Sequence, residues 1–198
     1  MAEDWIKHPI ILKGKVVDLL PLEKEHLEEL FIAASDEKLW EFIPTDCSSK
    51  NRFMEVYTTA ISEREAGRQY PFLVYHKSTG KLVGSTRLFE IVAKDRKLEI
   101  GWTWIMAEHW RTAVNIECKY LLLKYCFEEL KALRVQLKTD ELNTRSRKAI
   151  EKIGAKFEGI LRKDRIKDNG MSRNAAYYSI IDDEWSGVKK ELESKLGW

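Results

Sequence analysis

The hydrophobic pattern changes period twice between Leu98 and Thr139, and this change limits the folds open to the chain. Residues 98–105 are rich in aromatic and β-branched side chains, which is typical of a strand. From Val114 to Lys131 apolar residues recur at steps of three and four, as in a helix, and residues 134–139 alternate as in a strand. A strand, a helix and a strand in this order form a crossover, which joins parallel strands. The pattern therefore predicts a parallel pair at the centre of a sheet.

Hairpins are predicted on both sides of this crossover, because turn residues separate alternating segments at 78–80 and at 168–170. No internal repeat or Pro/Ser-rich linker divides the chain. We therefore expect one domain over residues 1–198, of the α/β class, with a mixed, mostly antiparallel twisted sheet of about seven strands flanked by helices. The other predicted strands are 15–20, 69–75, 82–91, 157–166 and 171–181, and the other predicted helices are 23–34, 51–67, 146–153 and 182–196.

Composition excludes several classes of protein. With 44% hydrophobic and 33% charged residues, 10 Gly and 4 Pro, the chain is neither collagen-like nor disordered. Its three cysteines, Cys47, Cys118 and Cys126, form no Cys-x-x-Cys pair and no Cys/His set with zinc spacing, so we expect no disulfide framework and no metal. No apolar stretch approaches ~18 residues and the start has no secretory pattern, so we expect no membrane partner and a cytoplasmic location.

The distribution of charge indicates what kind of ligand the chain binds. The formal net charge is only +2, so we expect no DNA partner. The segment from Lys138 to Arg173, however, contains eleven Lys and Arg residues but only six Asp and Glu residues. This local excess fits a small polyanionic ligand, although a solvated surface is an equally good interpretation of the sequence.

Residues 108–115 connect the strand that ends near Ile105 to the long helix. The N-terminus of a helix offers unpaired backbone N–H groups and positive dipole charge, a geometry that binds phosphate. The loop has neither the Lys-Ser/Thr of a nucleotide P-loop nor a Gly-x-Gly-x-x-Gly pattern, so it indicates neither nucleoside triphosphate nor dinucleotide binding. Thr112 or Asn115 could simply cap the helix.

A second polar segment, Asn143 to Ser146, follows the next strand and opens a short helix that stops at Gly154. Asn143 could act there only as a helix cap.

Taken in order, these elements resemble the GNAT superfamily of acetyl-CoA-dependent N-acetyltransferases, and most closely its RimJ/RimL-like branch, which is related to ribosomal-protein N-terminal acetyltransferases. The resemblance covers essentially the whole chain and implies that the two central parallel strands splay apart to receive the pantetheine arm of acetyl-CoA. The segments that carry it are Leu12–Leu22, Glu99–Trp102, Trp110–Asn115, Asn143–Ser146, Ala149–Gly154 and Asp182–Trp185.

The resemblance implies a set of cofactor-binding residues and two departures from the family pattern. After Arg111 the chain lacks the glycines of the usual pyrophosphate loop, and Ile150 occupies the place where many relatives carry a tyrosine that protonates the leaving thiolate. The expected cofactor-binding residues are Trp104, Ile105 and Met106, through their backbone, together with Arg111, Thr112, Ala113, Val114, Asn115 and Asn143.

The expected catalytic residues are Glu99 and Ser146. Glu99 on the central strand is the first candidate for the base that removes a proton from the amine, and His109 is a second candidate by residue type. Glu99 could instead be a paired structural carboxylate. Ser146 lies three residues after Asn143, on the same helix face, so we expect it to replace the absent tyrosine as proton donor to the CoA thiolate. Its alternative role is a bond to the backbone in the first helical turn.

The resemblance implies direct transfer of an acetyl group from acetyl-CoA to a primary amine, either a protein N-terminus or a small molecule. The alternative is a catalytically weak or inactive GNAT-fold module that associates with the ribosome or with RNA through residues 138–173. The sequence does not identify the acceptor, although residues 36–47 and 163–173 are expected on the acceptor side. It also allows a homodimer.

Overall fold

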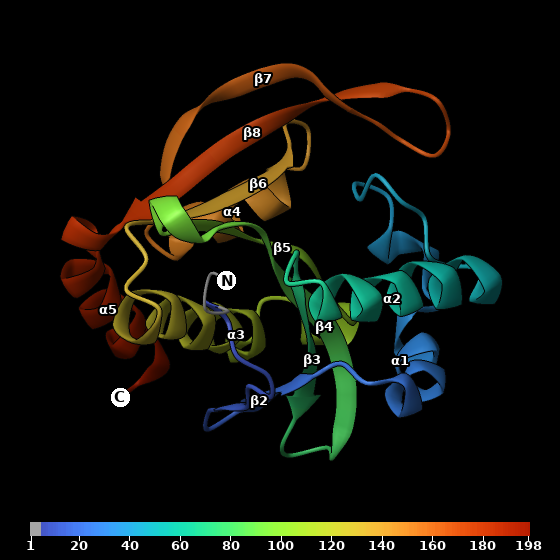
Figure 1. Ribbon diagram of the computed structural model, residues 1–198, viewed down its shortest axis with the longest axis horizontal. Helices are drawn as coiled ribbons and strands as arrows, with labels where there is room; N and C mark the ends of the chain where they lie inside the picture. The colour runs from blue at the N-terminus through green and yellow to red at the C-terminus, as the bar shows by residue number, and fades with distance from the viewer. Residues whose placement is uncertain (1–4) are drawn as a thin grey trace.

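Eight strands form one mixed sheet in the computed structural model, which describes residues 5–198 (Figure 1). The strand order is β1-β2-β3-β4-β5-β6-β8-β7, and every neighbouring pair is antiparallel except β5 and β6. The predicted mixed sheet is confirmed, and the strand beyond the expected seven is the two-residue β1. The strands are β1 (Leu12–Lys13), β2 (Val17–Pro21), β3 (Tyr70–His76), β4 (Lys81–Val92), β5 (Lys97–Ile105), β6 (Arg134–Asp140), β7 (Lys156–Ile166) and β8 (Ser172–Ile181).

Helices cover both faces of this sheet and bury two apolar clusters (Figure 1). The larger cluster lies under α3 and α5 and includes Leu122 and Val135, whereas the smaller lies under α1 and α2 and includes Phe53 and Trp104. Each helix buries the apolar side of its pattern, as the period of the sequence predicts. The helices are α1 (Leu27–Ala34), α2 (Lys50–Glu65), α3 (Ala113–Lys124), α4 (Thr144–Lys152) and α5 (Asp182–Leu196).

The parallel pair is short, and its two strands then separate. Only Lys97, Leu98 and Glu99 of β5 pair with β6, opposite residues 134–136. Beyond that point β5 carries a bulge, because Gly101 and Trp104 pair with β4 residues that are only two apart. Trp102 in this bulge has φ 51°, which is uncommon for a residue other than glycine. The expected splay of the central strands is therefore present.

Several predicted helix boundaries differ from the structure. The first α-helix begins at Leu27 and not at residue 23, and the short helix begins at Thr144 and not at residue 146. The helix expected to run to Lys131 is α-helical only to Lys124 and continues as a π-helical turn over Tyr125–Glu129, because apolar spacing does not distinguish the two windings. The last helix begins at Asp182, as the sequence predicts. The cap position is Ile181, whose N–H donates to Oε2 of Glu184 at 3.2 Å.

A buried carboxylate fixes α3 to the start of the sheet. Glu117 is fully buried and accepts hydrogen bonds from the backbone N–H groups of Lys15, Val16 and Val17 at 2.7, 2.7 and 2.6 Å. Gly14 lies so close that an added Cβ would stand 2.6 Å from the Glu117 carboxyl carbon. Hydrogen bonds to a charged acceptor are stronger than neutral ones, so this contact holds the helix against β2.

We expect Glu117→Gln to lower the free energy of unfolding by about 2 to 4 kcal/mol, because its amide group would face N–H donors that now meet a charged oxygen. Urea denaturation should show a lower midpoint with an unchanged slope. The exposed Glu191 on α5 provides the control, and Glu191→Gln should leave the midpoint nearly unchanged. Equal midpoints for Glu117→Gln and the wild type would contradict this role.

None of the helices within residues 5–198 combines the length and apolar character that crossing a membrane requires.

Candidate active site

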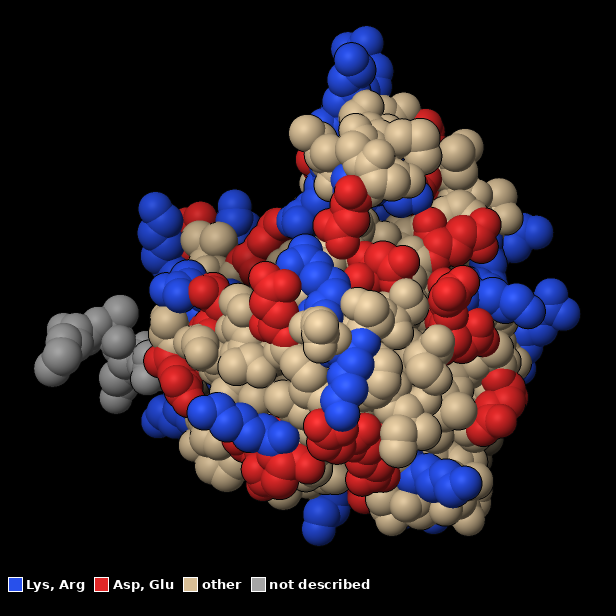
Figure 2. All heavy atoms as spheres, turned by 90° about the vertical axis from the view of Figure 1, so that its right-hand side faces the viewer, with Lys and Arg blue, Asp and Glu red and all other residues tan. Residues whose placement is uncertain are grey.

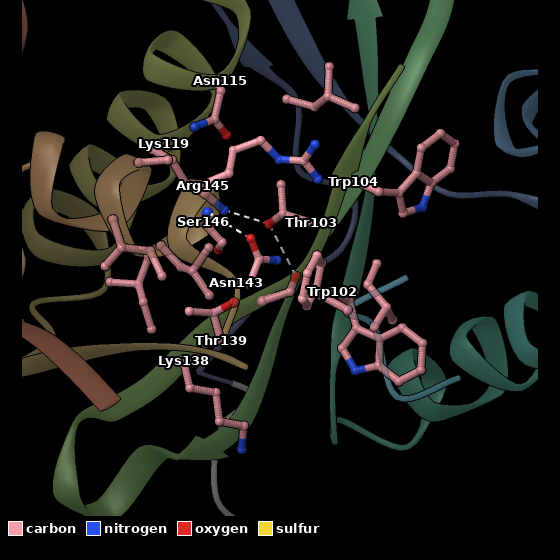
Figure 3. Close-up of a pocket in the computed structure, with 18 of the residues that line it drawn as sticks. Trp102, Thr103, Trp104, Asn115, Lys119, Lys138, Thr139, Asn143, Arg145 and Ser146 are labelled. Carbon is pink, nitrogen blue, oxygen red and sulfur yellow. Dashed lines mark hydrogen bonds between the residues drawn. The ribbon is translucent and has the colours of Figure 1, made fainter. Parts of the chain in front are cut away.

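A cleft of about 470 Å³ opens where β5 and β6 diverge. One wall is β5 from Glu99 to Ile105, and the opposite walls come from the start of α3, the end of β6 and the start of α4. Figure 3 shows Asn115 at one end of this cleft and Lys138 at the other, with side chains of α3 and α4 directed toward β5. Residues far apart in the sequence are thus brought to one gap in the sheet.

Positive charge dominates the lining of this cleft. Among the described residues, Glu99 is the only carboxylate in the lining, whereas eight Lys or Arg side chains contribute to it. On the face shown in Figure 2, by contrast, Lys and Arg are interspersed with Asp and Glu over the surface. The cleft therefore suits a polyanion better than this outer face does. The cationic residues are Arg111, Lys119, Lys138, Arg145, Lys148, Lys152, Arg165 and Arg173.

The loop before α3 takes a glycine-like conformation without a glycine. Arg111 has φ 65°, in the left-handed region that glycine adopts freely. Thr112 caps α3, since its Oγ1 accepts from the N–H of Val114 at 3.3 Å. The capping role that the sequence left open is thus filled by Thr112, and the N-terminus of the helix still points toward the cleft mouth, where Arg111, Thr112 and Asn115 line it.

Arg145 connects this loop to the second polar segment. Its guanidinium stacks on the Trp110 ring at 3.6 Å from the ring centre, and the Trp110 indole N–H donates to the Ile105 carbonyl at 2.7 Å. Among residues 5–198 no carboxylate forms an ion pair with Arg145. Arg145 is therefore a cation at the cleft mouth that is held by an aromatic face and not by an acid.

Most of the predicted cofactor-binding residues line the cleft, but three do not. Trp104, Ile105, Arg111, Thr112, Asn115 and Asn143 lie in its walls, whereas Met106, Ala113 and Val114 are outside the lining. The Met106 N–H donates to the Val83 carbonyl of β4 at 2.9 Å and so faces away from the gap. The Trp104 side chain belongs to the core, where its indole N–H donates to the Tyr57 hydroxyl.

Asn143 is the cap of α4. Its Oδ1 accepts from the Ser146 N–H at 2.9 Å, and its amide nitrogen makes no hydrogen bond within residues 5–198 and can meet a ligand in the cleft. The Ser146 hydroxyl faces the same cleft and makes no hydrogen bond within the described part of the chain. Ile150, the residue in place of the tyrosine, is buried one turn further along the helix and also lines the cleft.

Glu99 is buried at the inner end of the cleft, where the parallel pairing stops. It is 1% exposed, and its Oε2 accepts from the Gln136 amide at 2.7 Å and lies 3.3 Å from Lys138 Nζ. Burial raises the pKa of Glu99 to about 7, although Lys138 and Gln136 oppose the shift. A carboxylate with such a pKa can take up a proton near neutral pH.

His109, the other candidate base, lies at the opposite end of β5. Ile105, the last residue of β5, lies six residues after Glu99, roughly 20 Å along an extended strand, and His109 follows four residues later. Its ring packs against His76 at 4.6 Å between ring centres. His109 lines the mouth of the cleft rather than the inner end.

The two segments expected on the acceptor side contact each other beside this inner end. The Arg173 guanidinium donates to the Phe42 carbonyl at 2.9 Å, and the Asp168 N–H donates to the Pro44 carbonyl at 2.9 Å. Phe42, Pro44 and Arg173 line the cleft, whereas Trp40 is buried in the core. The tip of the β7–β8 hairpin and residues 42–44 therefore form one wall together.

Sequence reasoning missed two polar side chains in the gap, Lys119 and Thr103. Lys119 on α3 is 6% exposed and donates to Thr103 Oγ1 at 2.5 Å, and Thr103 in turn bonds Thr86 Oγ1 at 2.8 Å (Figure 3). The one sequence feature that could have indicated Lys119 is its position inside the apolar run from Cys118 to Leu123. A charged residue inside such a run is either a solvated helix position or a functional group, and the sequence does not distinguish them.

The conformation of Arg111 yields a stability prediction. Both Arg111→Gly and Arg111→Ala remove the guanidinium, but only glycine relieves the left-handed backbone, so we expect Arg111→Gly to be more stable than Arg111→Ala by about 1 kcal/mol. Urea unfolding of the two variants measures this difference. Equal stabilities would mean that the loop leaves this conformation once the arginine is removed.

Comparisons with known proteins agree with this geometry. Residues 17–156 match an acetyltransferase (GNAT) domain. The chain is 32% identical over 180 residues to a Bacillus subtilis (strain 168) protein named "Putative ribosomal N-acetyltransferase YdaF", covering 86% of this chain and 92% of that one.

Solved structures show the same fold. A GCN5-related N-acetyltransferase from Brucella melitensis superposes with a TM-score of 0.86 at 27% identity, covering 93% of this chain and 84% of that one. Mycobacterium smegmatis RimJ in complex with CoA-disulfide superposes with a TM-score of 0.79 at 19% identity, covering 94% and 91%. By its domain match, its relatives and its splayed cationic cleft, this chain belongs to the GNAT family of N-acetyltransferases.

Proposed function

We propose that this acetyltransferase moves an acetyl group from acetyl-CoA directly to a primary amine, with Glu99 as the base. The observation that supports this most strongly is the position of Glu99, a buried carboxylate at the inner end of a cleft that is otherwise cationic. The acceptor amine would approach from the side of Phe42 and Arg173, and the phosphates would lie at the other end.

The residues of the cleft mouth fit the phosphates of CoA. The N-terminus of α3, the Arg111 side chain and Arg145, which has no ion pair within residues 5–198, all place positive charge at the mouth of the cleft. No carboxylate forms an ion pair with Arg145 within residues 5–198, so a polyanion that binds there would not have to break one. The free amide nitrogen of Asn143 would donate to the pantetheine arm deeper in the gap.

The chemistry requires an amine without its extra proton and a stabilised oxyanion. A lysine-like amine has a pKa near ~10.4 and an N-terminal amine near ~8, so Glu99 would remove a proton before attack. The backbone N–H groups of β5 along the gap would stabilise the oxygen of the attacked carbonyl. The Ser146 hydroxyl would donate to the departing sulfur, in the place where Ile150 offers no polar group.

The acceptor is proposed only at the level of a primary amine, on a protein N-terminus or a small molecule. Relatives named as ribosomal N-acetyltransferases, such as YdaF, make an N-terminus of a ribosomal protein the first acceptor to test. The wall formed by residues 42–44 and the β7–β8 hairpin is where an acceptor would be recognised.

Two measurements test the proposal together. Acetyl-CoA should raise the melting temperature, corresponding to about 2.7 kcal/mol of stabilisation at a hundredfold excess over Kd. Thiol release from acetyl-CoA should appear with a panel of amines and N-terminal peptides. A melting curve unchanged by acetyl-CoA would refute the proposal. Stabilisation without thiol release from any acceptor, together with salt-sensitive RNA binding, would favour the binding module instead.

The pKa of Glu99 predicts how the rate depends on pH. Only the ionised carboxylate accepts a proton, so kcat should fall as the pH drops below about 7 and should level off above it. Glu99→Gln should lower kcat by about 10²-fold or more and abolish this ionisation from the profile. The control is Glu90→Gln, which removes another carboxylate partner of Lys138 at 3.1 Å. It should keep the ionisation in the profile but move it to lower pH, because Glu90 no longer raises the pKa of Glu99. An unchanged profile in Glu99→Gln would assign the base elsewhere.

Ser146→Ala should lower kcat by ~10-fold or more while the KM for acetyl-CoA and the melting temperature stay nearly constant. The reason is that the hydroxyl is not used within the described structure, so its loss removes no internal hydrogen bond. Steady-state kinetics and a melting curve suffice. If kcat is retained, a water molecule is the better candidate for the donor.

A further inference from the structure

The buried lysine in the gap between the strands has no place in the mechanism described so far. Lys119 lies four residues after Asn115 on the same helix face, about 6 Å deeper into the cleft. It is seven residues beyond Thr112, the cap of the phosphate-binding end. Lys119 is therefore beyond the reach expected for the phosphates, at the level where Asn143 and Ser146 also line the cleft (Figure 3).

The surroundings of Lys119 leave its charge without a counterion. Its Nζ donates to Thr103 Oγ1, and within residues 5–198 it has no ion pair. The neighbouring Glu117 carboxylate is directed to the backbone of residues 15–17, and Cys118 is a buried thiol. Burial lowers the pKa of Lys119 to about 8. A buried ammonium without a carboxylate is costly, and an anion formed beside it would relieve that cost.

Acetyl transfer forms such an anion deep in the cleft. When the amine nitrogen bonds to the carbonyl carbon, the C–S bond breaks and the sulfur keeps the electron pair as a thiolate. We propose that Lys119 is the counter-charge and proton source for this thiolate: one ammonium proton moves to the sulfur, directly or through the Ser146 hydroxyl. This inference rests on the proposed acetyl transfer.

The step balances in atoms and charge. The acceptor ammonium loses one proton to the Glu99 carboxylate before attack, and the CoA sulfur gains one from Lys119, which becomes a neutral amine. Lys119 then takes up the remaining extra proton of the acylated nitrogen and Glu99 releases its proton to solvent, so the products are the amide, CoA thiol and one proton. A lysine whose pKa lies close to the ~8.5 of a thiol transfers its proton with little energetic mismatch.

The test uses CoA itself and needs no acceptor. Thiolate formation in bound CoA can be followed by its ultraviolet absorbance as the pH is raised. In the wild-type complex the pKa of the CoA thiol should be lower than in free CoA by about one unit or more, because a neighbouring cation favours the thiolate. In Lys119→Met, which keeps the length of the side chain and removes its charge, this shift should disappear.

The matched control is Lys124→Met, which removes an exposed lysine from the same helix and should keep the wild-type thiol pKa. Lys119→Gln is the second variant if Lys119→Met does not fold, as judged by its melting curve. Both Lys119 variants should also lower kcat by about 10²-fold with little change in the KM for acetyl-CoA.

The outcomes separate this inference from the function on which it rests. Wild-type protein that binds CoA with an unshifted thiol pKa, or a shift that survives in Lys119→Met and Lys119→Gln, overturns the role of Lys119 and leaves acetyl transfer intact. Weaker CoA binding in these variants without a change in thiol pKa would assign the lysine to the pantetheine arm, and also overturns the inference. A wild-type protein that binds no CoA refutes both proposals.

Discussion

The divergence of β5 and β6 is the constraint on which the rest of the site depends. Parallel strands normally continue side by side until one of them ends, yet here the pairing stops after Glu99 and Gln136. β5 carries a bulge at Trp102 against β4, and beyond Glu99 its other edge has no pairing with β6 and borders the cleft. Because buried backbone groups need partners, a gap of this kind is stable only where a ligand or water completes it. The unpaired backbone of β5 is thus available to a ligand in the cleft.

The polar groups around this gap are distributed by depth. Cations without acid partners lie at the mouth, the Asn143 and Ser146 side chains and Lys119 lie in the middle, and Glu99 lies at the inner end. Burial acts on the two deep ionisable groups in opposite directions, raising the pKa of the Glu99 carboxyl to about 7 and lowering that of Lys119 to about 8. One cleft thus contains a carboxyl group and an ammonium group whose pKa values both lie near neutrality. General acid–base catalysis needs groups with such pKa values.

The loop before α3 adopts a left-handed backbone conformation although it contains no glycine. The chain has no glycine between Arg111 and Asn115, but Arg111 itself adopts the left-handed conformation that a glycine would take. The cost of about 1 to 2 kcal/mol for such a residue is small beside the stabilisation of a packed domain core. Arg111 also places a cation at the mouth of the cleft, which a glycine at this position would not do.

The sequence by itself determined the order and type of the main strands and helices, the central crossover and the motif segments, because period, turn residues and spacing are local properties. It also supplied Glu99, Asn143 and Ser146 as candidates. Only the tertiary structure decided that Lys119 belongs to the cleft, that Met106 faces away from it and that Glu117 anchors the start of the sheet. These outcomes depend on burial and on contacts between residues up to about 100 positions apart, and neither is encoded in any local pattern of the chain.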